Sequence, residues 1–244
     1  RDRSVSRGLG DVYKRQGLTC KNLISYAPSA GNSSIENLPD FAKKGIKRYN
    51  SISVRDYTTE NLVFQVTGKH PQIVLDPTLL ANWEVNVDSP VKKKDYILFY
   101  YCEHLPVHIK TQIFDYAHKN GLAVYGAGDS DKDYDECTVN LTPEEWVAMF
   151  KNARFVFTGT FHGVIFSILN HRQFKVYLTN KGRIAKVGNL LSYFSIKDRE
   201  IDNHYIFDLE KQRSEIDYAS IDRIIDKQRL ESLNYLRDSI QSTK

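Results

Sequence analysis

The sequence predicts an α/β protein of two lobes, each built on a parallel sheet, with a cleft between them. Short apolar segments typical of buried strands alternate with segments in which apolar residues recur at helical spacing. A polar stretch at residues 82–94, which contains Pro90 and three consecutive lysines, interrupts this alternation as a linker would. The alternation then starts again. Two Rossmann-type lobes are therefore expected, with ligands at the carboxyl ends of their strands.

The first lobe is expected to contain three strands and two helices. The strands are predicted at residues 22–26, 51–54 and 73–75, and the helices at residues 35–49 and 58–66. Each helical segment carries its apolar residues on one side, whereas the strand segments are short apolar runs. Asp76 and Pro77 follow the third strand directly and are typical of a turn.

The second lobe repeats the pattern and ends in a long amphipathic helix. Strands are predicted at residues 96–101, 122–125, 155–158 and 174–178, and helices at residues 106–120, from Thr142 onward, 164–169, 183–194 and 216–240. Pro106 and Gly121 stand where helices prefer proline and glycine. The run Thr142-Pro143-Glu144-Glu145 combines a threonine cap, proline at the first position and glutamate at the third, which is typical of a helix start.

Composition supports a globular protein of one large or two modest domains. The 244 residues are 41% hydrophobic and 26% charged, which argues against collagen-like, disordered and disulfide-framework proteins. Three cysteines, an odd number without paired spacing, fit a reducing cytoplasm. No apolar run approaches the roughly 18 residues that a membrane-spanning helix needs.

Residues 1–16 are set apart as a leader that does not belong to the fold. They have no helical or strand periodicity and no apolar core of a signal peptide, and they resemble translated sequencing-adaptor read-through. We expect the biological sequence to begin near Gly17 and to have lost its true N-terminus, which leaves the first lobe incomplete. The remainder carries 29 basic and 28 acidic residues, so net charge does not predict nucleic-acid binding. The expected division is 17–88 for the first lobe, 89–215 for the second and 216–244 for a C-terminal helix.

The segment Phe155–Leu178 is the most informative for function. An apolar strand runs through a short turn containing His162 into an apolar helix, which would place His162 and the amide of Gly163 at a helix N-terminus. That position favours an anion, and a histidine there could transfer a proton near neutral pH. A histidine that merely packs or caps the turn is the alternative.

A second candidate lies where the strand at 51–54 ends in Arg55 and Asp56. The planar guanidinium of an arginine fits a carboxylate or a phosphate. Asp56 is kept with it as a substrate-binding candidate, although capping of the next helix is the favoured interpretation because aspartate is a preferred N-cap. Tyr26 and Ser29, in the loop after the first strand, could contact acceptor hydroxyls, with turn packing as the favoured alternative.

Several conspicuous patterns are weaker than they look. Residues 129–136 begin like a calcium loop, but Tyr134 stands where glycine is required and Asn140 where the closing glutamate belongs. Cys102, His104 and His108 lack zinc-ligand spacing. The Gly126-Ala127-Gly128 run lacks the third glycine of a dinucleotide fingerprint. We therefore expect a solvated acidic loop and no metal site.

Taken in order, four runs and the terminal helix resemble the polysaccharide pyruvyl transferase family. The runs are ISYAPSAG (24–31), SISVRDYTTENL (51–62), IVLDPTLL (73–80) and FTGTFHGVIFSILNHRQF (157–174). Arg183 followed by Asn189-Leu190-Leu191 is similar to the next helix of many members, and residues 232–236 fall where the terminal helix has Ser-x-x-(Tyr/Phe)-Leu. The resemblance spans residues 21–240.

The resemblance implies a GT-B-like fold and transfer of pyruvate from phosphoenolpyruvate to a sugar of a cell-surface polysaccharide or its precursor, as a ketal. By position, Arg55 and His162 match residues implicated in donor binding and catalysis. Several members have arginine two residues before the histidine. Thr160 stands there instead and resembles a subgroup with Ser-Phe-His-Gly, so Arg183 is the candidate for the missing charge.

The expected chemistry needs cations at both ends of the donor. Arg55 and Arg183 would hold its carboxylate and phosphate, Thr160 and the Gly163 amide would assist, and His162 would act as the acid. The expectation includes no metal and no cofactor, with phosphoenolpyruvate as co-substrate. It also includes a saccharide acceptor that could be lipid-linked, and a cytoplasmic location, which could be the inner face of the membrane. The alternatives are a GT-B-type glycosyltransferase that uses a sugar nucleotide and a non-catalytic truncated remnant.

Overall fold

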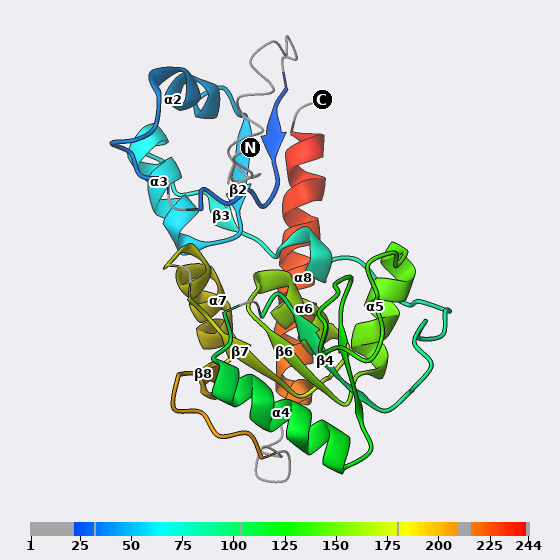
Figure 1. The fold of residues 1–244 in the computed structure, drawn as a ribbon. Coiled ribbons are helices and arrows are strands. Elements are labelled where there is room, and N and C mark those ends of the chain that lie inside the picture. The colour runs from blue at the N-terminus through cyan, green and yellow to red at the C-terminus, as the bar shows by residue number, and fades with distance from the viewer. Residues whose placement is uncertain (1–21, 32, 103, 180, 209–215, 243–244) are drawn as a thin grey trace. The chain divides into compact units, whose positions relative to one another are not determined.

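The computed structural model describes residues 22–31, 33–102, 104–179, 181–208 and 216–242. The chain divides into two compact units: the first takes residues through Ala81 together with 222–244, and the second takes residues 82–221. Each unit has its own parallel sheet with helices packed on it (Figure 1). The predicted α/β class with two parallel sheets is therefore confirmed. The leader at residues 1–16 lies outside the described residues.

The first unit is built on three short parallel strands in the order β1-β2-β3. Its elements are β1 (Ile24–Ser25), α2 (Asp40–Ile46), β2 (Ser51–Val54), α3 (Tyr57–Thr67), β3 (Gln72–Ile73) and the short 3₁₀ helix η1 (Pro77–Leu79). Helices α2 and α3 pack on the sheet through a buried aliphatic cluster that includes Ala42, Ile46, Val54 and Val63.

Helix α2 is shorter than the sequence predicts. It begins at Asp40, whereas residues 35–38 form turns. Pro39 explains the difference, because proline disfavours helical backbone at the residue before it and cannot donate a backbone hydrogen bond itself. Helix α3 matches its prediction more closely and ends at Gly68, whose φ of +72° is the left-handed conformation that glycine adopts readily.

Helix α8 (Tyr218–Gln241) is shared between the units rather than forming a part of its own. Near its start, the Tyr218 hydroxyl donates to the carbonyl of Arg172 in the second unit. Farther along, the Tyr235 hydroxyl donates to the Ser25 carbonyl over 2.8 Å, and the Ser232 hydroxyl accepts from the Leu75 amide over 3.0 Å. Tyr235 thus binds α8 to β1, and Ser232 binds it to the residues that follow β3.

The second unit has five parallel strands in the order β5-β4-β6-β7-β8. Its elements are β4 (Tyr96–Tyr100), α4 (Val107–Lys119), β5 (Ala123–Gly126), α5 (Pro143–Asn152), β6 (Phe155–Thr158), α6 (Phe161–Leu169), β7 (Phe174–Tyr177), α7 (Lys181–Tyr193), the 3₁₀ helix η2 (Lys197–Arg199) and β8 (Glu200–Ile201). The two-residue β8 was not predicted. Such a short strand has no recognisable periodicity.

Alternate residues of the central strands pack against helices on opposite faces of the sheet. Ile97 and Phe99 lie in the cluster covered by α4. Tyr100 instead packs edge-on against Trp146 of α5, with ring centroids 5.1 Å apart. The strands are buried on both faces, which explains their nearly continuous apolar sequences.

The predicted linker packs onto the second unit. Trp83 lies edge-on to Phe166 with ring centroids 5.2 Å apart, Val91 is buried, and the hydroxyls of Ser89 and Tyr96 are 3.2 Å apart. These contacts explain why the first boundary lies at 81/82 and not at the predicted 88/89. The second boundary lies at 221/222, within α8, whereas the sequence predicts 215/216. Polar composition identifies the segment as irregular but does not indicate what its few apolar side chains contact.

Replacing Ser232 with alanine tests how α8 is held. The variant loses the acceptor of the Leu75 amide in a fully buried position. An unsatisfied buried amide costs about 1–3 kcal/mol. We expect faster hydrogen exchange at residues 73–76 and a lower free energy of unfolding. Ser242→Ala, at an exposed serine near the end of the same helix, serves as the control. Equal exchange in the two variants would contradict the docking role.

Candidate functional site

The carboxyl end of β6 leads directly into α6 through Gly159 and Thr160. Helix α6 begins at Phe161, earlier than the predicted residue 164. Thr160 is its N-cap, and its hydroxyl accepts from the Gly163 amide over 3.0 Å. The cap extends the helix backward, because it satisfies an amide that would otherwise lack a partner within the first turn.

His162 lies in the first turn of α6 and is exposed. Its ring is edge-on to that of Phe161, with centroids 5.6 Å apart. The structure therefore places the imidazole beside the positive end of a helix dipole, as the sequence predicts. An exposed histidine at such a position can meet an anionic ligand.

Gly163 has a packing role. A Cβ at this position would overlap the hydroxyl of Thr158, which is itself buried, and would lie 3.0 Å from the Thr160 hydroxyl. Its amide donates to the Thr160 hydroxyl, and the expected role of this amide in binding phosphate stays a prediction. The glycine instead allows α6 to start directly against the end of β6.

Arg183 of α7 reaches the same end of β6. Its Nη1 is 3.5 Å from the Gly159 carbonyl oxygen, and its Cζ lies 5.9 Å from the centre of the Tyr101 ring. We call Tyr101, Gly159, Thr160, His162 and Arg183 the β6-edge cluster. Within the second unit, the structure thus brings together three of the predicted site residues, Thr160, His162 and Arg183.

Cys102 lies beside this cluster but is not suited to nucleophilic catalysis. Burial raises the pKa of its thiol to about 12, although the contact with the Tyr100 carbonyl and the nearby Arg183 charge oppose the shift in part. A thiol that stays protonated at neutral pH is a weak nucleophile and a poor metal ligand. His108, from the rejected zinc pattern, contacts the Asn203 carbonyl through Nε2 at 2.9 Å.

In the first unit, Arg55 forms an ion pair with Asp76. Nη1 of Arg55 donates to Oδ2 of Asp76, while Oδ1 of Asp76 accepts from the Thr78 amide over 2.9 Å. The Asp76 side chain is 4% exposed and that of Arg55 is 24% exposed, so the carboxylate is buried and the guanidinium partly accessible. In the sequence, Asp76 follows a predicted strand, and a turn is the favoured interpretation. Because β2 and β3 are parallel neighbours, residues that follow them lie side by side, and that adjacency was the missed signal.

Asp56 caps α3, as the favoured interpretation of the sequence states. Its Oδ1 accepts from the amide of Thr59 over 2.8 Å and from the Thr59 hydroxyl over 2.6 Å. The Thr59 hydroxyl in turn accepts from the Ala30 amide over 2.8 Å. Asp56 therefore links α3 to the loop after β1 through Thr59. These hydrogen bonds of its carboxylate are made to residues of the chain itself.

Tyr26 and Ser29 also serve internal packing. The Tyr26 hydroxyl donates to the Leu75 carbonyl over 2.9 Å, and burial raises the pKa of this phenol. Ser29 is only 1% exposed. These contacts agree with the turn-packing alternative for both residues.

Arg55 belongs to the first unit and His162 to the second. Their convergence across a cleft, which the sequence analysis expects, stays a prediction.

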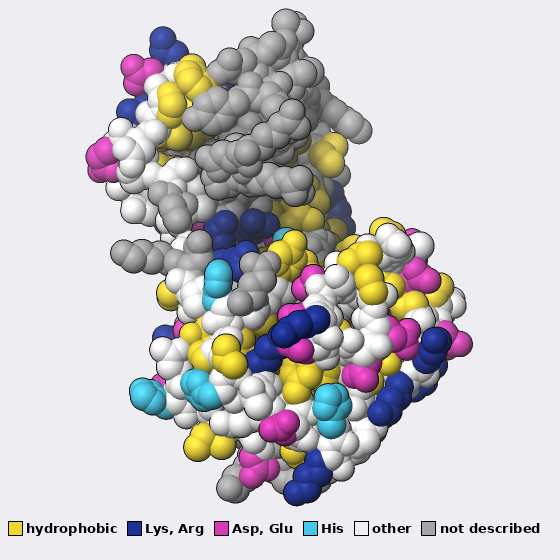
Figure 2. Space-filling model, in the orientation of Figure 1, with side chains coloured by type: hydrophobic (Ala, Val, Ile, Leu, Met, Phe, Trp, Pro, Cys, Tyr) yellow, Lys and Arg dark blue, Asp and Glu magenta, His cyan; other side chains and the backbone are white. Residues whose placement is uncertain are grey.

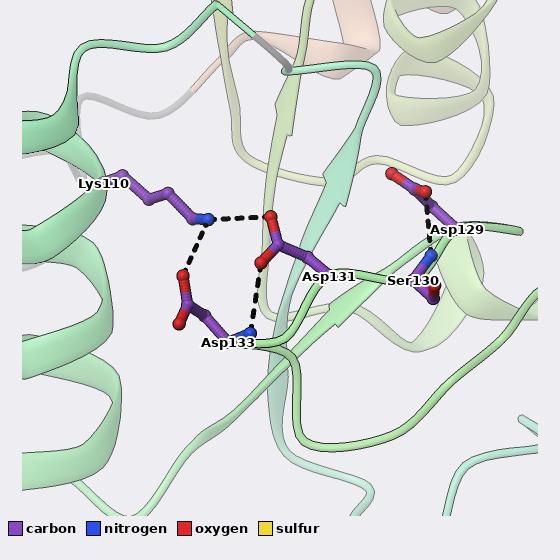
Figure 3. A network of polar contacts seen from close by, with 5 residues as sticks. All are labelled: Lys110, Asp129, Ser130, Asp131 and Asp133. Atoms are coloured by element: carbon purple, nitrogen blue, oxygen red, sulfur yellow. Dashed lines mark hydrogen bonds and ion pairs between the residues drawn. The ribbon is translucent and has the colours of Figure 1, made fainter.

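The acidic loop after β5 binds a lysine of the chain itself (Figure 3). Lys110 of α4 donates to Asp131 over 2.9 Å and to Asp133 over 3.1 Å. The carboxylate of Asp129 accepts from the Ser130 amide over 2.8 Å. Among the described residues, no group of three histidine, cysteine, aspartate or glutamate side chains could hold a metal ion. The ion pairs of Lys110 therefore hold this loop against α4.

Charges of both signs are interspersed on the face of the second unit seen in Figure 2. This mixture matches the near balance of basic and acidic residues in the sequence. None of the helices in the described ranges is both long and apolar enough to span a bilayer.

Comparison with known families assigns the chain. The model for the polysaccharide pyruvyl transferases matches residues 15–178, which is more than half of the chain. The chain belongs to the polysaccharide pyruvyl transferase family. The matched region includes Arg55, the β6-edge residues through His162, and β7, whereas Arg183 lies just beyond it. The family is one of transferases, in agreement with the enzyme class that the sequence predicts.

Comparison with curated proteins finds no significant match. Among solved structures, the chain is similar to one described as the glycotransferase of kitacinnamycin, with a TM-score of 0.37 and 13% identity. That alignment covers 69% of this chain and 44% of the other, so the chain spans less than half of that protein's length.

Replacing Gly163 with alanine tests the tight junction of β6 and α6. The added methyl group would overlap buried Thr158, and overpacking of this kind costs about 1–3 kcal/mol. We expect a lower free energy of unfolding in urea. Gly188→Ala is the matched control, because this glycine of α7 has open space around it and alanine favours helix by about 0.5–1 kcal/mol. A stability gain in both variants would contradict the close packing.

The ion pairs of Lys110 with Asp131 and Asp133 predict a pH-dependent contribution to the free energy of unfolding. The Lys110 ammonium lowers the pKa of Asp131 below its ordinary value of 3.8, so the stabilisation is present above that value and is lost as pH falls through the folded-state pKa. Lys110→Met should therefore cost up to about 1 kcal/mol at neutral pH. The cost, measured by urea unfolding, should shrink as pH falls below 3.8. An equal cost at neutral and at acidic pH would show that packing, rather than charge, explains the effect.

Proposed function

We propose that this protein transfers the pyruvyl group of phosphoenolpyruvate to a saccharide and forms a cyclic ketal. Membership of the polysaccharide pyruvyl transferase family carries the proposal. The β6-edge cluster supports it, because an exposed histidine in the first turn of α6 and an arginine against the Gly159 carbonyl both lie at the carboxyl end of a parallel strand.

Two arginines are assigned to the donor, which carries a carboxylate and a phosphate. Arg183 lies against the Gly159 carbonyl next to the N-terminus of α6, where the helix dipole also favours an anion. Arg55 is oriented by buried Asp76, and its guanidinium is partly exposed. An arginine has five N–H donors, so one can hold the aspartate while others bind an oxyanion.

His162 is assigned as the general acid. Its imidazolium gives a proton to the methylene carbon of phosphoenolpyruvate, and C2 acquires oxocarbenium character. One acceptor hydroxyl then bonds to C2 and releases its proton. A second hydroxyl of the same sugar then displaces phosphate from C2 and closes the ketal ring, and its proton leaves with the inorganic phosphate. The sequence of steps is balanced without an oxidant or a reductant.

The acceptor is assigned as a sugar of a cell-surface polysaccharide or its lipid-linked precursor. We assign the reaction to the cytoplasm, at the inner face of the membrane when the acceptor is lipid-linked. The free thiols of Cys102 and Cys137 fit a reducing compartment.

Phosphate release tests the donor and the acid together. The protein is incubated with phosphoenolpyruvate and a panel of saccharides, while inorganic phosphate is measured and the ketal methyl group is followed by NMR. His162→Ala should lower the rate by at least about 100-fold, the scale of a lost general acid. His204→Ala, at an exposed histidine of the same unit, serves as the control. Transfer from nucleotide sugars in place of phosphoenolpyruvate, or normal turnover by His162→Ala, would overturn the assignment.

Arg55→Lys separates donor binding from folding. Lysine can keep the ion pair with buried Asp76 but lacks the remaining donors of the guanidinium. We expect a fold as stable as that of the wild type, with a KM for phosphoenolpyruvate raised by about tenfold or more. An unchanged KM would remove Arg55 from the donor site.

A further inference from the structure

Tyr101 of the β6-edge cluster stands out because its backbone is unfavourable and its ring is accessible. The residue follows β4 directly, has a φ of +53° and is 50% exposed. Left-handed backbone is uncommon for a bulky side chain and persists where the surroundings enforce it, often at functional sites. An asparagine or glycine would fit this backbone better.

The neighbouring backbone explains what holds Tyr101 in place. In the β4–β6 pairing, Tyr100 is opposite Thr158, and the Gly159 amide donates to the Tyr100 carbonyl over 3.2 Å. A Cβ on Gly159 would lie only 2.5 Å from the carbonyl oxygen of Tyr101. Tyr101 is therefore positioned against the turn that leads into His162.

The ring of Tyr101 is supported by two contacts of different kinds. Tyr100 meets it edge-on, with ring centroids 4.9 Å apart. The Arg183 guanidinium lies 5.9 Å from its centre, within the range of a cation–π interaction. Half of the residue nevertheless remains exposed, which is a large area for an aromatic side chain beside a site.

We propose that Tyr101 binds the sugar ring of the acceptor and holds it next to the donor that Arg183 binds. This inference rests on the proposed function. The C–H face of a pyranose ring is apolar and slightly positive, so it stacks on the electron-rich face of an aromatic ring. Because Arg183 contacts the same tyrosine, the platform brings the acceptor and the donor's anionic group to adjacent positions.

The matched pair Tyr101→Asn and Tyr101→Phe tests the platform. Asparagine tolerates the left-handed backbone and removes the ring, whereas phenylalanine keeps the ring and removes only the hydroxyl. Methyl glycosides of glucose, galactose, mannose and N-acetylglucosamine serve as probes at millimolar concentration, with saturation-transfer NMR as the readout. We expect binding by the wild type and by Tyr101→Phe, and its loss in Tyr101→Asn, whose thermal midpoint is unchanged or higher.

Steady-state kinetics supply a second readout. Tyr101→Asn should raise the KM for the saccharide by about tenfold and leave the KM for phosphoenolpyruvate unchanged. A raised KM for phosphoenolpyruvate alone would overturn the proposal, because Tyr101 would then act only by positioning Arg183. Glycoside binding that is absent in the wild type, or unaffected by Tyr101→Asn, would also overturn it.

The outcomes separate this inference from the proposed function. If the wild type consumes phosphoenolpyruvate normally and Tyr101→Asn retains its KM for the saccharide, only the platform fails. If the wild type binds glycosides through Tyr101 but does not release phosphate from phosphoenolpyruvate, the donor assignment fails while the sugar platform survives.

Discussion

The β6-edge cluster depends on how closely the backbone can approach its neighbours at two glycines. Gly159 passes against the carbonyl of Tyr101, and Gly163 rests on the buried side chain of Thr158. Because neither position has a side chain, β6 can lead directly into α6. His162 therefore lies close to the carboxyl end of β6, in the first turn of the helix. Thr160 completes the junction by accepting from the Gly163 amide. The position of the imidazole thus follows from the close packing at the two glycines and from the Thr160 cap.

The first unit reaches comparable rigidity through polar contacts. Asp76 orients Arg55 and also caps the short helix η1, while Asp56 and Thr59 fix the loop after β1. Burial of a carboxylate is costly unless it is paired or hydrogen-bonded. The Asp76 carboxylate has both kinds of partner, because it pairs with Arg55 and accepts from the Thr78 amide. An arginine held in this way loses less side-chain entropy when it binds an anion, which is the advantage of preorganisation.

Alternating apolar segments were sufficient to predict the α/β class, and the residues Thr160, His162 and Arg183 were placed together on family resemblance. Local sequence could not reveal contacts that depend on neighbouring strands. The pairing of Arg55 with Asp76 follows from the adjacency of β2 and β3, and the position of Tyr101 follows from the β4–β6 register. The predicted helix start at residue 164 does not anticipate that Thr160 caps α6 and accepts from the Gly163 amide. Pro39 prevents α2 from starting earlier than Asp40, although the apolar spacing that predicts a helix continues across it.

The first unit is built from two segments that lie far apart in the sequence, and this arrangement has a consequence for biosynthesis. The strands of this unit precede residues 82–221 in the chain, whereas the part of α8 that belongs to it follows them. Domains generally fold as units during synthesis. Residues 82–221 therefore emerge from the ribosome before Ser232 and Tyr235 can form their hydrogen bonds with Leu75 and Ser25. The synthesis of the first unit therefore starts before residues 82–221 and is completed only after them.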